Sequence, residues 1–305
     1  MKHPRYVVVT PVRNEANYAA DTIASMVRQT MLPEQWVIVD DGSTDGTGDL
    51  IAAAAREHPW ITAVRRPDRG FRQSGGGVVE AFYDGYAALR EERWEFIVKL
   101  DGDLTFEPEY FESCFARFAD DPRLGIGGGT ILVQDNGRLS VDSPGAPPFH
   151  VRGATKIYRR ACWEAISPLV RAPGWDTVDE VTANMHGWST RTFSGVSLVQ
   201  CRPTGATDGE WRNWHKNGLA NYTTGYHPIF MLAKCVKRAF QRPPLAAAGL
   251  FAGFCSGYLK RLPRVPDDKA VRYLRRQQLR RLMLRPSIYS NRDSRPPKRC
   301  VSIGL

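Results

Sequence analysis

The sequence lacks any apolar run long enough to cross a membrane as a helix. Such a helix needs about 20 predominantly apolar residues, and the longest candidate, residues 245–259, falls short of this and is rich in glycine and alanine. The amino-terminal residues 1–12 contain only a short run of valines, unlike the apolar region of a signal peptide. These absences predict a cytoplasmic protein that meets a membrane from one side only.

Cysteine is scarce, and glycine is missing from the segment that follows the first predicted strand. The six cysteines lie at irregular intervals with no CxxC pair and no histidines at zinc-binding spacing, which argues against a disulfide framework or a structural zinc site. The segment TPVRNEAN, residues 10–17, contains no glycine. A nucleotide-sugar pyrophosphorylase or a dinucleotide oxidoreductase would carry a glycine-rich loop after its first strand, so both classes are disfavoured.

Acidic residues are nearly absent from the carboxyl-terminal part of the chain. Residues 234–305 hold 18 of the 42 Lys and Arg but only 3 of the 32 Asp and Glu. Apolar residues between these cations favour amphipathic helices that lie on an anionic membrane surface. No nucleic-acid-binding module is recognisable, so nucleic acid is not an expected partner. We therefore predict a domain of residues 1–233 and a basic helical tail of residues 234–305, whose last fifteen residues look poorly structured.

The first third of the chain alternates β-branched runs with helical segments. Repeated βα units of this kind predict an α/β fold with a doubly wound, mostly parallel sheet flanked by helices. In such a sheet, ligands bind at the carboxyl ends of the strands. The predicted strands span residues 6–11, 36–41, 61–66 and 96–100.

Polar clusters follow three of these strands. TPVRNEAN follows the first, DDGSTDGT the second, and the fourth ends in Asp101 and Asp103 around Gly102. Residues i and i+2 of a strand face the same side, so the two carboxylates can meet at one point, with Gly102 leaving room for a ligand. Carboxylates without histidine or cysteine suit Mg²⁺ or Mn²⁺. A simple turn is the alternative for Asp-Gly-Asp alone, but the convergence of three clusters favours a metal site.

Together, VVVTPVRNEANYAADTIASMVRQT, WVIVDDGSTDGT and VKLDGDLTFEPEYF resemble the family 2 glycosyltransferases, over roughly residues 5–200. The resemblance implies a GT-A fold, with a nucleotide-binding half of about residues 1–110 and an acceptor half of about 111–233. It implies inverting transfer from a nucleotide-diphosphate sugar, with a divalent metal held by Asp101 and Asp103. The other implied donor-binding residues are Thr10, Pro11, Glu15, Asp41, Arg69 and Arg72.

The resemblance also implies a place in cell-envelope polysaccharide or glycolipid synthesis, with a saccharide or lipid-linked acceptor. Together with the basic tail, this predicts a peripheral position at the inner face of the plasma membrane.

The family's catalytic base lies in a second acidic motif, from which GWDTVDEVTANMHGW, residues 174–188, departs. Thr177 and Glu180 have the T-x-x-E spacing of a capping box, which would place Asp179 in the first turn of a helix, facing the acceptor. We favour Asp179 as the base. Asp176 and Glu180 remain the alternatives.

Aromatic and basic residues are concentrated in GEWRNWHKNGLANY, residues 209–222. Trp211, Trp214, His215 and Lys216 suit a lid that closes over a sugar or a diphosphate. A helix that packs its tryptophans on the core is an equally good interpretation, and both stay open.

Overall fold

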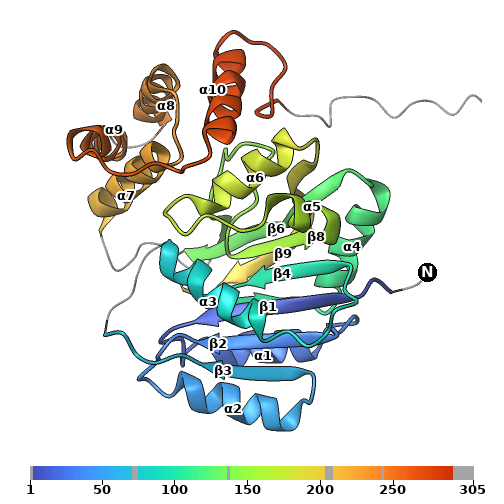
Figure 1. Cartoon of the computed structure of the whole chain (residues 1–305). Coiled ribbons are helices and arrows are strands. Elements are labelled where there is room, and N and C mark those ends of the chain that lie inside the picture. Colours follow the sequence, from blue (N-terminus) through green and yellow to red (C-terminus); the bar gives the residue numbers. More distant parts are fainter. Residues whose placement is uncertain (1–2, 71–74, 136–137, 203–208, 242–243, 291–305) are drawn as a thin grey trace, which may run out of the picture.

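The computed structural model describes residues 3–70, 75–135, 138–202, 209–241 and 244–290. It shows a central sheet with helices on both faces and a group of helices beyond one side of it (Figure 1). The strands are β1 Tyr6–Val12, β2 Gln35–Asp40, β3 Ile61–Arg65, β4 Phe96–Leu100, β5 Leu104–Phe106, β6 Leu124–Asp135, β7 Arg138–Val141, β8 Thr155–Arg159 and β9 Ser189–Gln200. The helices are α1 Ala19–Val27, α2 Thr47–Glu57, α3 Gly76–Ala87, α4 Tyr110–Asp120, α5 Arg160–Ile166, α6 Trp175–Met185, α7 Glu210–Thr223, α8 Pro228–Gln241, α9 Pro244–Leu259 and α10 Asp268–Leu282.

The sheet is parallel in its first part and mixed in its second. Its order is β3-β2-β1-β4-β8-β6-β9-β5, with β7 paired to β6. Strands β1 to β4 pair only in parallel with one another, and their ends lie within one residue of the predicted ones. The predicted α/β fold is therefore confirmed. Antiparallel pairing begins at β8, which lies between β4 and β6.

Alternate residues of the inner strands pack on opposite faces of the sheet. On β1, Tyr6 and Val8 join the core beneath α1, α2 and α4, whereas Val7 and Val9 join the core beneath α3, α5 and α6. Because both faces are covered, β1 and β2 are buried along their whole length. The ends of these strands are consequently the places where their polar residues can reach a ligand.

A third core joins the carboxyl-terminal helices to the rest of the molecule. Met231 of α8, Leu250 of α9 and Leu274 of α10 pack in one cluster with Val181 of α6 and with Phe149. The boundary predicted between residues 233 and 234 falls inside α8. The described part of the predicted tail, residues 234–241 and 244–290, thus packs on the rest of the molecule, and the helical group begins earlier, at α7. The last fifteen residues lie outside the described residues.

Glycines let α7 and α9 approach closely. A Cβ atom on Gly218 would overlap the carbonyl oxygen of Leu250, and one on Gly253 would overlap that of His215. Larger residues at these positions would force the two helices apart. The glycine and alanine content that made residues 245–259 a poor membrane span therefore serves this contact.

Candidate active site

Asp101 and Asp103 lie at the end of β4, as the sequence predicts. Asp101 follows the strand, is partly exposed and accepts a bond from the ammonium of Lys99, which also donates to the carbonyl of Gly153 at 2.6 Å. Asp103 is only 2% exposed, and its Oδ2 accepts from Nε2 of Gln200 at 3.1 Å. Burial, and then the nearby charge of Asp101, raise the pKa of the Asp103 carboxyl.

The donor set at this edge fits a hard divalent cation. Oδ1 of Asp103 is buried and accepts no hydrogen bond from the described residues, an arrangement that is costly unless a cation or water completes it. Nowhere in the described ranges do three His, Cys, Asp or Glu side chains gather as metal ligands. Mg²⁺ and Mn²⁺ often take only one or two carboxylates from the protein and the rest from substrate phosphates and water.

Gly102 has a different role from the expected one. A Cβ atom there would overlap Cγ1 of Val12 on the neighbouring strand. Packing within the protein thus explains this glycine, and the expectation that it leaves room for a ligand is wrong.

Asp41 lies at the end of β2 among arginines. Its two carboxylate oxygens accept from Arg66 and Arg69, and its carbonyl accepts from Arg13. Arg72 lies outside the described residues. The structure therefore brings Asp41 and Arg69 together, and Arg66 and Arg13 are neighbours that sequence reasoning did not single out.

A pocket opens beside Asp41. Gly42 forms part of its lining and has a positive φ of 73°, and a Cβ atom on it would lie 2.5 Å from Cα of Asp68. Only glycine fits this turn, because both the backbone angle and the close approach exclude a side chain. The lining residues are Gly42, Ser43, Thr44, Arg65, Arg66, Pro67 and Asp68.

The remaining residues implied for donor binding, two on β1 and one just after it, are buried. The hydroxyl of Thr10 accepts from Nε1 of Trp36 at 2.8 Å, inside the core beneath α1 and α2. Pro11 lies within β1 beside Val39, one residue before the strand ends. Glu15 is 4% exposed, and its Oε1 pairs with Arg202 at 2.8 Å. Of the three, Glu15 is the one connected to Asp103, because one arginine contacts both carboxylates.

That link is Arg202, which sequence reasoning missed. It follows β9, and its Nε lies 3.5 Å from Oδ2 of Asp103. Because β9 pairs antiparallel with β5, the end of β9 meets Asp103, and the Cys201 amide donates to the Asp103 carbonyl at 2.8 Å. Only the strand order shows this proximity, since 98 positions separate the residues in the chain.

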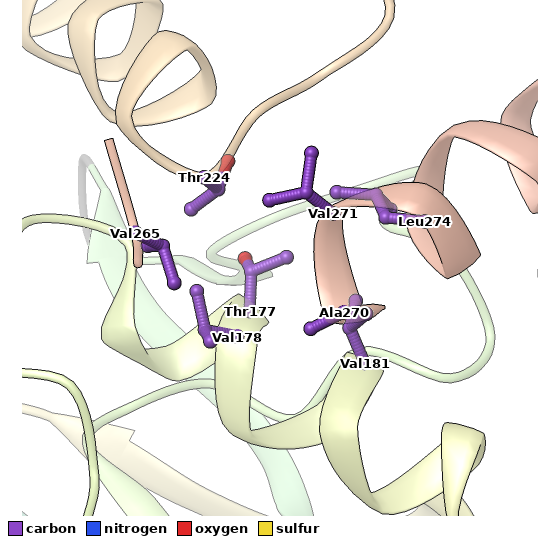
Figure 2. Close-up of a pocket in the computed structure, with 8 residues that line it drawn as sticks. All are labelled: Thr177, Val178, Val181, Thr224, Val265, Ala270, Val271 and Leu274. Atoms are coloured by element: carbon purple, nitrogen blue, oxygen red, sulfur yellow. The ribbon is translucent and has the colours of Figure 1, made fainter. Parts of the chain in front are cut away.

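The second acidic motif forms α6, which begins earlier than expected. Gly174, with a φ of 85°, is the N-cap residue, and no side chain caps the helix. The predicted capping box is therefore wrong. Thr177 instead lines a small apolar pocket between α6 and α10, together with Val178 and Val181 (Figure 2). Asp176, not Asp179, lies in the first turn.

Asp179 and Glu180 belong to a buried ion cluster. Lys156 of β8 donates to both oxygens of Asp179, at 2.8 and 2.9 Å, and to Glu180 at 2.8 Å, and Tyr158 donates to Asp179 at 2.6 Å. Burial raises the pKa of Asp179 to about 6. The ammonium of Lys156 lowers this pKa, but only partly, because the carboxylate of Glu180 raises it as well. His150 also contacts Glu180, at 2.9 Å. Neither carboxylate is open to an acceptor in this arrangement.

Asp176 is the more accessible of the three base candidates. It is partly exposed, and a side chain on Gly153 would contact it. Burial would raise the pKa of Asp176, but His150 and three further cations, Lys156 among them, hold it below its ordinary value. Since Lys99 bonds both Asp101 and the carbonyl of Gly153, Asp176 lies on the same side of the sheet edge as the first carboxylate of the Asp-Gly-Asp motif.

The lid candidates all lie on α7, which packs mainly on α9. Trp214 lies beneath the guanidinium of Arg238 at 4.2 Å and beside Gly249, and His215 lies against Gly253. Trp211 and Lys216 are exposed. The packing interpretation accounts for Trp214 and His215, and closure over a ligand stays a prediction.

The family model for glycosyl transferase family 2 matches residues 7–166, which include β1 to β8 and both carboxylates of the Asp-Gly-Asp motif. The match spans more than half of the chain. The chain belongs to glycosyl transferase family 2. The sequence resemblance is thus confirmed.

Curated family 2 relatives cover parts of the chain. Chondroitin synthase of Pasteurella multocida is 29% identical over 121 residues, which are 40% of this chain and 12% of the relative. The putative glycosyltransferase EpsH of Bacillus subtilis is 26% identical over 182 residues, 54% of this chain and 50% of EpsH. The chain therefore spans half or less of the length of these relatives.

Solved glycosyltransferase structures share the fold. A mannosyltransferase of Pyrobaculum calidifontis, in complex with GDP-Man and Mn²⁺, has a TM-score of 0.53 at 20% identity, over 94% of this chain and 77% of that one. TarS residues 1–349 of S. aureus, in complex with UDP-GlcNAc, has a TM-score of 0.51 at 17% identity, over 71% and 65% of the two chains. The GT-A type of this fold is thus established, whereas these similarities say nothing of this chain's own ligands.

Proposed function

We propose that this family 2 member is an inverting glycosyltransferase that uses Mn²⁺ or Mg²⁺ and a nucleotide-diphosphate sugar. The observation that carries the proposal is the buried Oδ1 of Asp103, which accepts no hydrogen bond from the described residues and lies close to Asp101 at the carboxyl end of β4. Family membership and the nucleotide-sugar ligands of the structural neighbours support it.

The nucleoside end of the donor is assigned to the pocket beside Asp41. Carboxylate and guanidinium groups here can bond a base or a ribose, and Gly42 allows the tight turn against Asp68 that forms part of the pocket lining. Arg69, which already contacts Asp41, is the described cation assigned to the diphosphate. Thr10 and Pro11 are buried within β1 and are not among the residues that line this pocket, so their contact with the donor stays a prediction.

Asp101 and Asp103 are the residues that would hold the metal. When bound, a divalent ion neutralises charge that develops on the leaving diphosphate. Lys99 fixes the Asp101 carboxylate on the strand end, and Gln200 fixes that of Asp103. Both carboxylates are thus held in position before a ligand arrives.

Asp176 is the proposed base, in place of Asp179, because Asp179 is enclosed in the ion cluster. The Asp176 carboxylate would take the proton from the acceptor hydroxyl as the oxygen attacks the anomeric carbon, and the nucleoside diphosphate leaves from the opposite face. Lys156 donates to the carbonyl of Asp176 and so fixes the start of α6. Asp179 and Glu180 hold Lys156 in that position.

An anionic membrane surface is the proposed partner of the helical group. Helix α8 exposes an apolar stripe, 51% to 89% exposed, made of Ile229, Leu232, Val236 and Phe240. Leu259 of α9 and Leu284 after α10 are also strongly exposed, and Lys260, Arg261 and Arg285 accompany them. Exposed apolar side chains accompanied by cations are typical of a surface that lies on anionic lipid. None of the described helices has the length and apolar character needed to cross the bilayer.

A donor panel tests the reaction. The full chain is incubated with UDP-, GDP- and dTDP-sugars, and release of the nucleoside diphosphate is measured with Mn²⁺, with Mg²⁺ and with EDTA. We expect one nucleotide class to be consumed, with activity that EDTA abolishes and Mn²⁺ restores. Full turnover in EDTA would contradict the metal assignment, and consumption of none of the donors would count against the reaction class.

Liposome co-sedimentation tests the membrane proposal. Wild-type chain should sediment with vesicles containing anionic lipid, and less so as salt increases. Leu232→Glu should reduce sedimentation several-fold, whereas Leu32→Glu, at a similarly exposed residue between α1 and β2, should not. Equal loss in both variants, or no binding to anionic vesicles, would contradict the proposal; self-association without lipid would indicate a second copy as the partner of this face.

A further inference from the structure

Arg202 lies between two buried carboxylates, Glu15 and Asp103, that follow the neighbouring parallel strands β1 and β4. Its guanidinium pairs with Oε1 of Glu15 at 2.8 Å, and its Nε lies 3.5 Å from Oδ2 of Asp103. The side chains of Glu15 and Asp103 are 5% and 2% exposed, whereas that of Arg202 is 29% exposed. The arginine therefore covers the two carboxylates on the solvent side.

The two contacts of Arg202 are unequal. The Glu15 contact has hydrogen-bond length, whereas the Asp103 contact is longer and lies on the oxygen that Gln200 also bonds. The other oxygen of Asp103 accepts no bond from any described residue. A divalent ion at Asp103 would face the guanidinium charge at close range, and repulsion acts on the weaker of the arginine's two contacts.

We propose that Arg202 is a positioning residue that competes with the divalent metal for Asp103 and turns to the donor diphosphate when the metal displaces it. The Glu15 contact holds the guanidinium near the site throughout the exchange. This proposal rests on the proposed function. Arg202 would then couple metal binding to donor binding. A metal ion that binds Asp103 frees the Arg202 guanidinium to contact the donor phosphates.

Two titrations test the exchange, and Arg202→Gln should change the two affinities in opposite directions. Free Mn²⁺ is measured by electron paramagnetic resonance with the full chain and no nucleotide. Arg202→Gln should bind Mn²⁺ about five- to tenfold more tightly than wild type, the scale of one part-exposed ion pair. At saturating Mn²⁺, UDP, GDP and dTDP are then titrated by calorimetry, and the one that binds wild type should bind Arg202→Gln about tenfold more weakly.

Controls separate the exchange from a structural role. Arg160→Gln removes an arginine that also pairs with a carboxylate, Glu164 at 2.9 Å, but lies on α5; it should change neither titration. If Arg202→Gln does not fold, Arg202→Lys keeps a charge that cannot bridge both carboxylates as a planar group, and it should shift both titrations in the same directions by less.

The failures are distinguishable. Unchanged or weaker Mn²⁺ binding in the folded Arg202 variant, with binding in wild type abolished by Asp103→Asn, overturns the exchange and leaves the metal site intact. Equal Mn²⁺ binding in wild type and Asp103→Asn overturns both the metal site and the exchange.

Discussion

The molecule contains two clusters of carboxylates, built in opposite ways. At the sheet edge, the carboxylates of Asp101 and Asp103 offer more acceptor oxygens than the neighbouring donors fill. One buried oxygen, Oδ1 of Asp103, has no described partner. Between α6 and β8, Asp179 and Glu180 share the ammonium of Lys156 and are closed off from solvent. The candidate site thus leaves one carboxylate oxygen without a described partner, whereas the cluster on α6 pairs its carboxylates with Lys156. Substitutions in the two clusters should consequently affect different measurements.

The largest difference between the effect on turnover and the effect on stability is expected for Asp103→Asn. Loss of the metal carboxylate should lower turnover at least about a thousandfold, about 4 kcal/mol at the barrier. Burial raises the folded-state pKa of Asp103 above its unfolded value, so the ionised group weakens folding near neutral pH. The variant should therefore melt at the same temperature as wild type or higher, measured by calorimetry. A lower melting temperature together with lost turnover would indicate a structural carboxylate instead.

Lys156→Met should have the converse effect. It leaves Asp179 and Glu180 buried without their ammonium, and such a change costs about 3–5 kcal/mol of unfolding free energy. Guanidinium chloride denaturation of the full chain measures the loss. Adding Asp179→Asn and Glu180→Gln should recover much of it; a triple variant as unstable as the single one would mean that packing, not charge, dominates this cluster.

Asp176→Asn and Asp179→Asn compare the accessible carboxylate with an enclosed one. If Asp176 is the base, its variant should lose about a hundredfold or more in kcat with little change in melting temperature. Asp179→Asn should retain kcat within about tenfold and change stability instead. The comparison is made with the donor found in the panel, at one pH near 7. The reverse pattern would restore Asp179 as the base.

The smallest effect concerns His150 at the edge of the enclosed cluster. Glu180 raises the pKa of His150 above its ordinary value although burial lowers it. Its stabilising contribution is then fully present below about pH 6.5 and is lost as the pH rises through the folded-state pKa. Unfolding free energies measured from pH 6 to 9 should decline by about 1 kcal/mol in wild type and should not show this decline in His150→Gln. Parallel profiles would show that another group titrates.

The sequence predicted β1 to β4 closely because their period and strand-end motifs are local. It also predicted Asp101 and Asp103 correctly as strand-end residues. The capping box failed because Gly174 starts α6 through its backbone angle, which the T-x-x-E spacing does not register. Burial of Asp179 could not be predicted, since its partner Lys156 lies on β8 and comes beside it only through antiparallel strand pairing.

The contact between α6 and the carboxyl-terminal helices restricts how this protein can diversify. Tyr273 of α10 donates to the carbonyl of Asn184, and Ala270 and Leu274 of α10 line a small pocket together with Val181 of α6, the helix that carries Asp176. A lineage could not exchange α8 to α10 for other helices while keeping α6 unchanged, because the substitute would have to reproduce the inner surface on which α6 packs. Helix α6, with the proposed base, and the carboxyl-terminal helices proposed to contact a membrane should therefore be inherited as one unit.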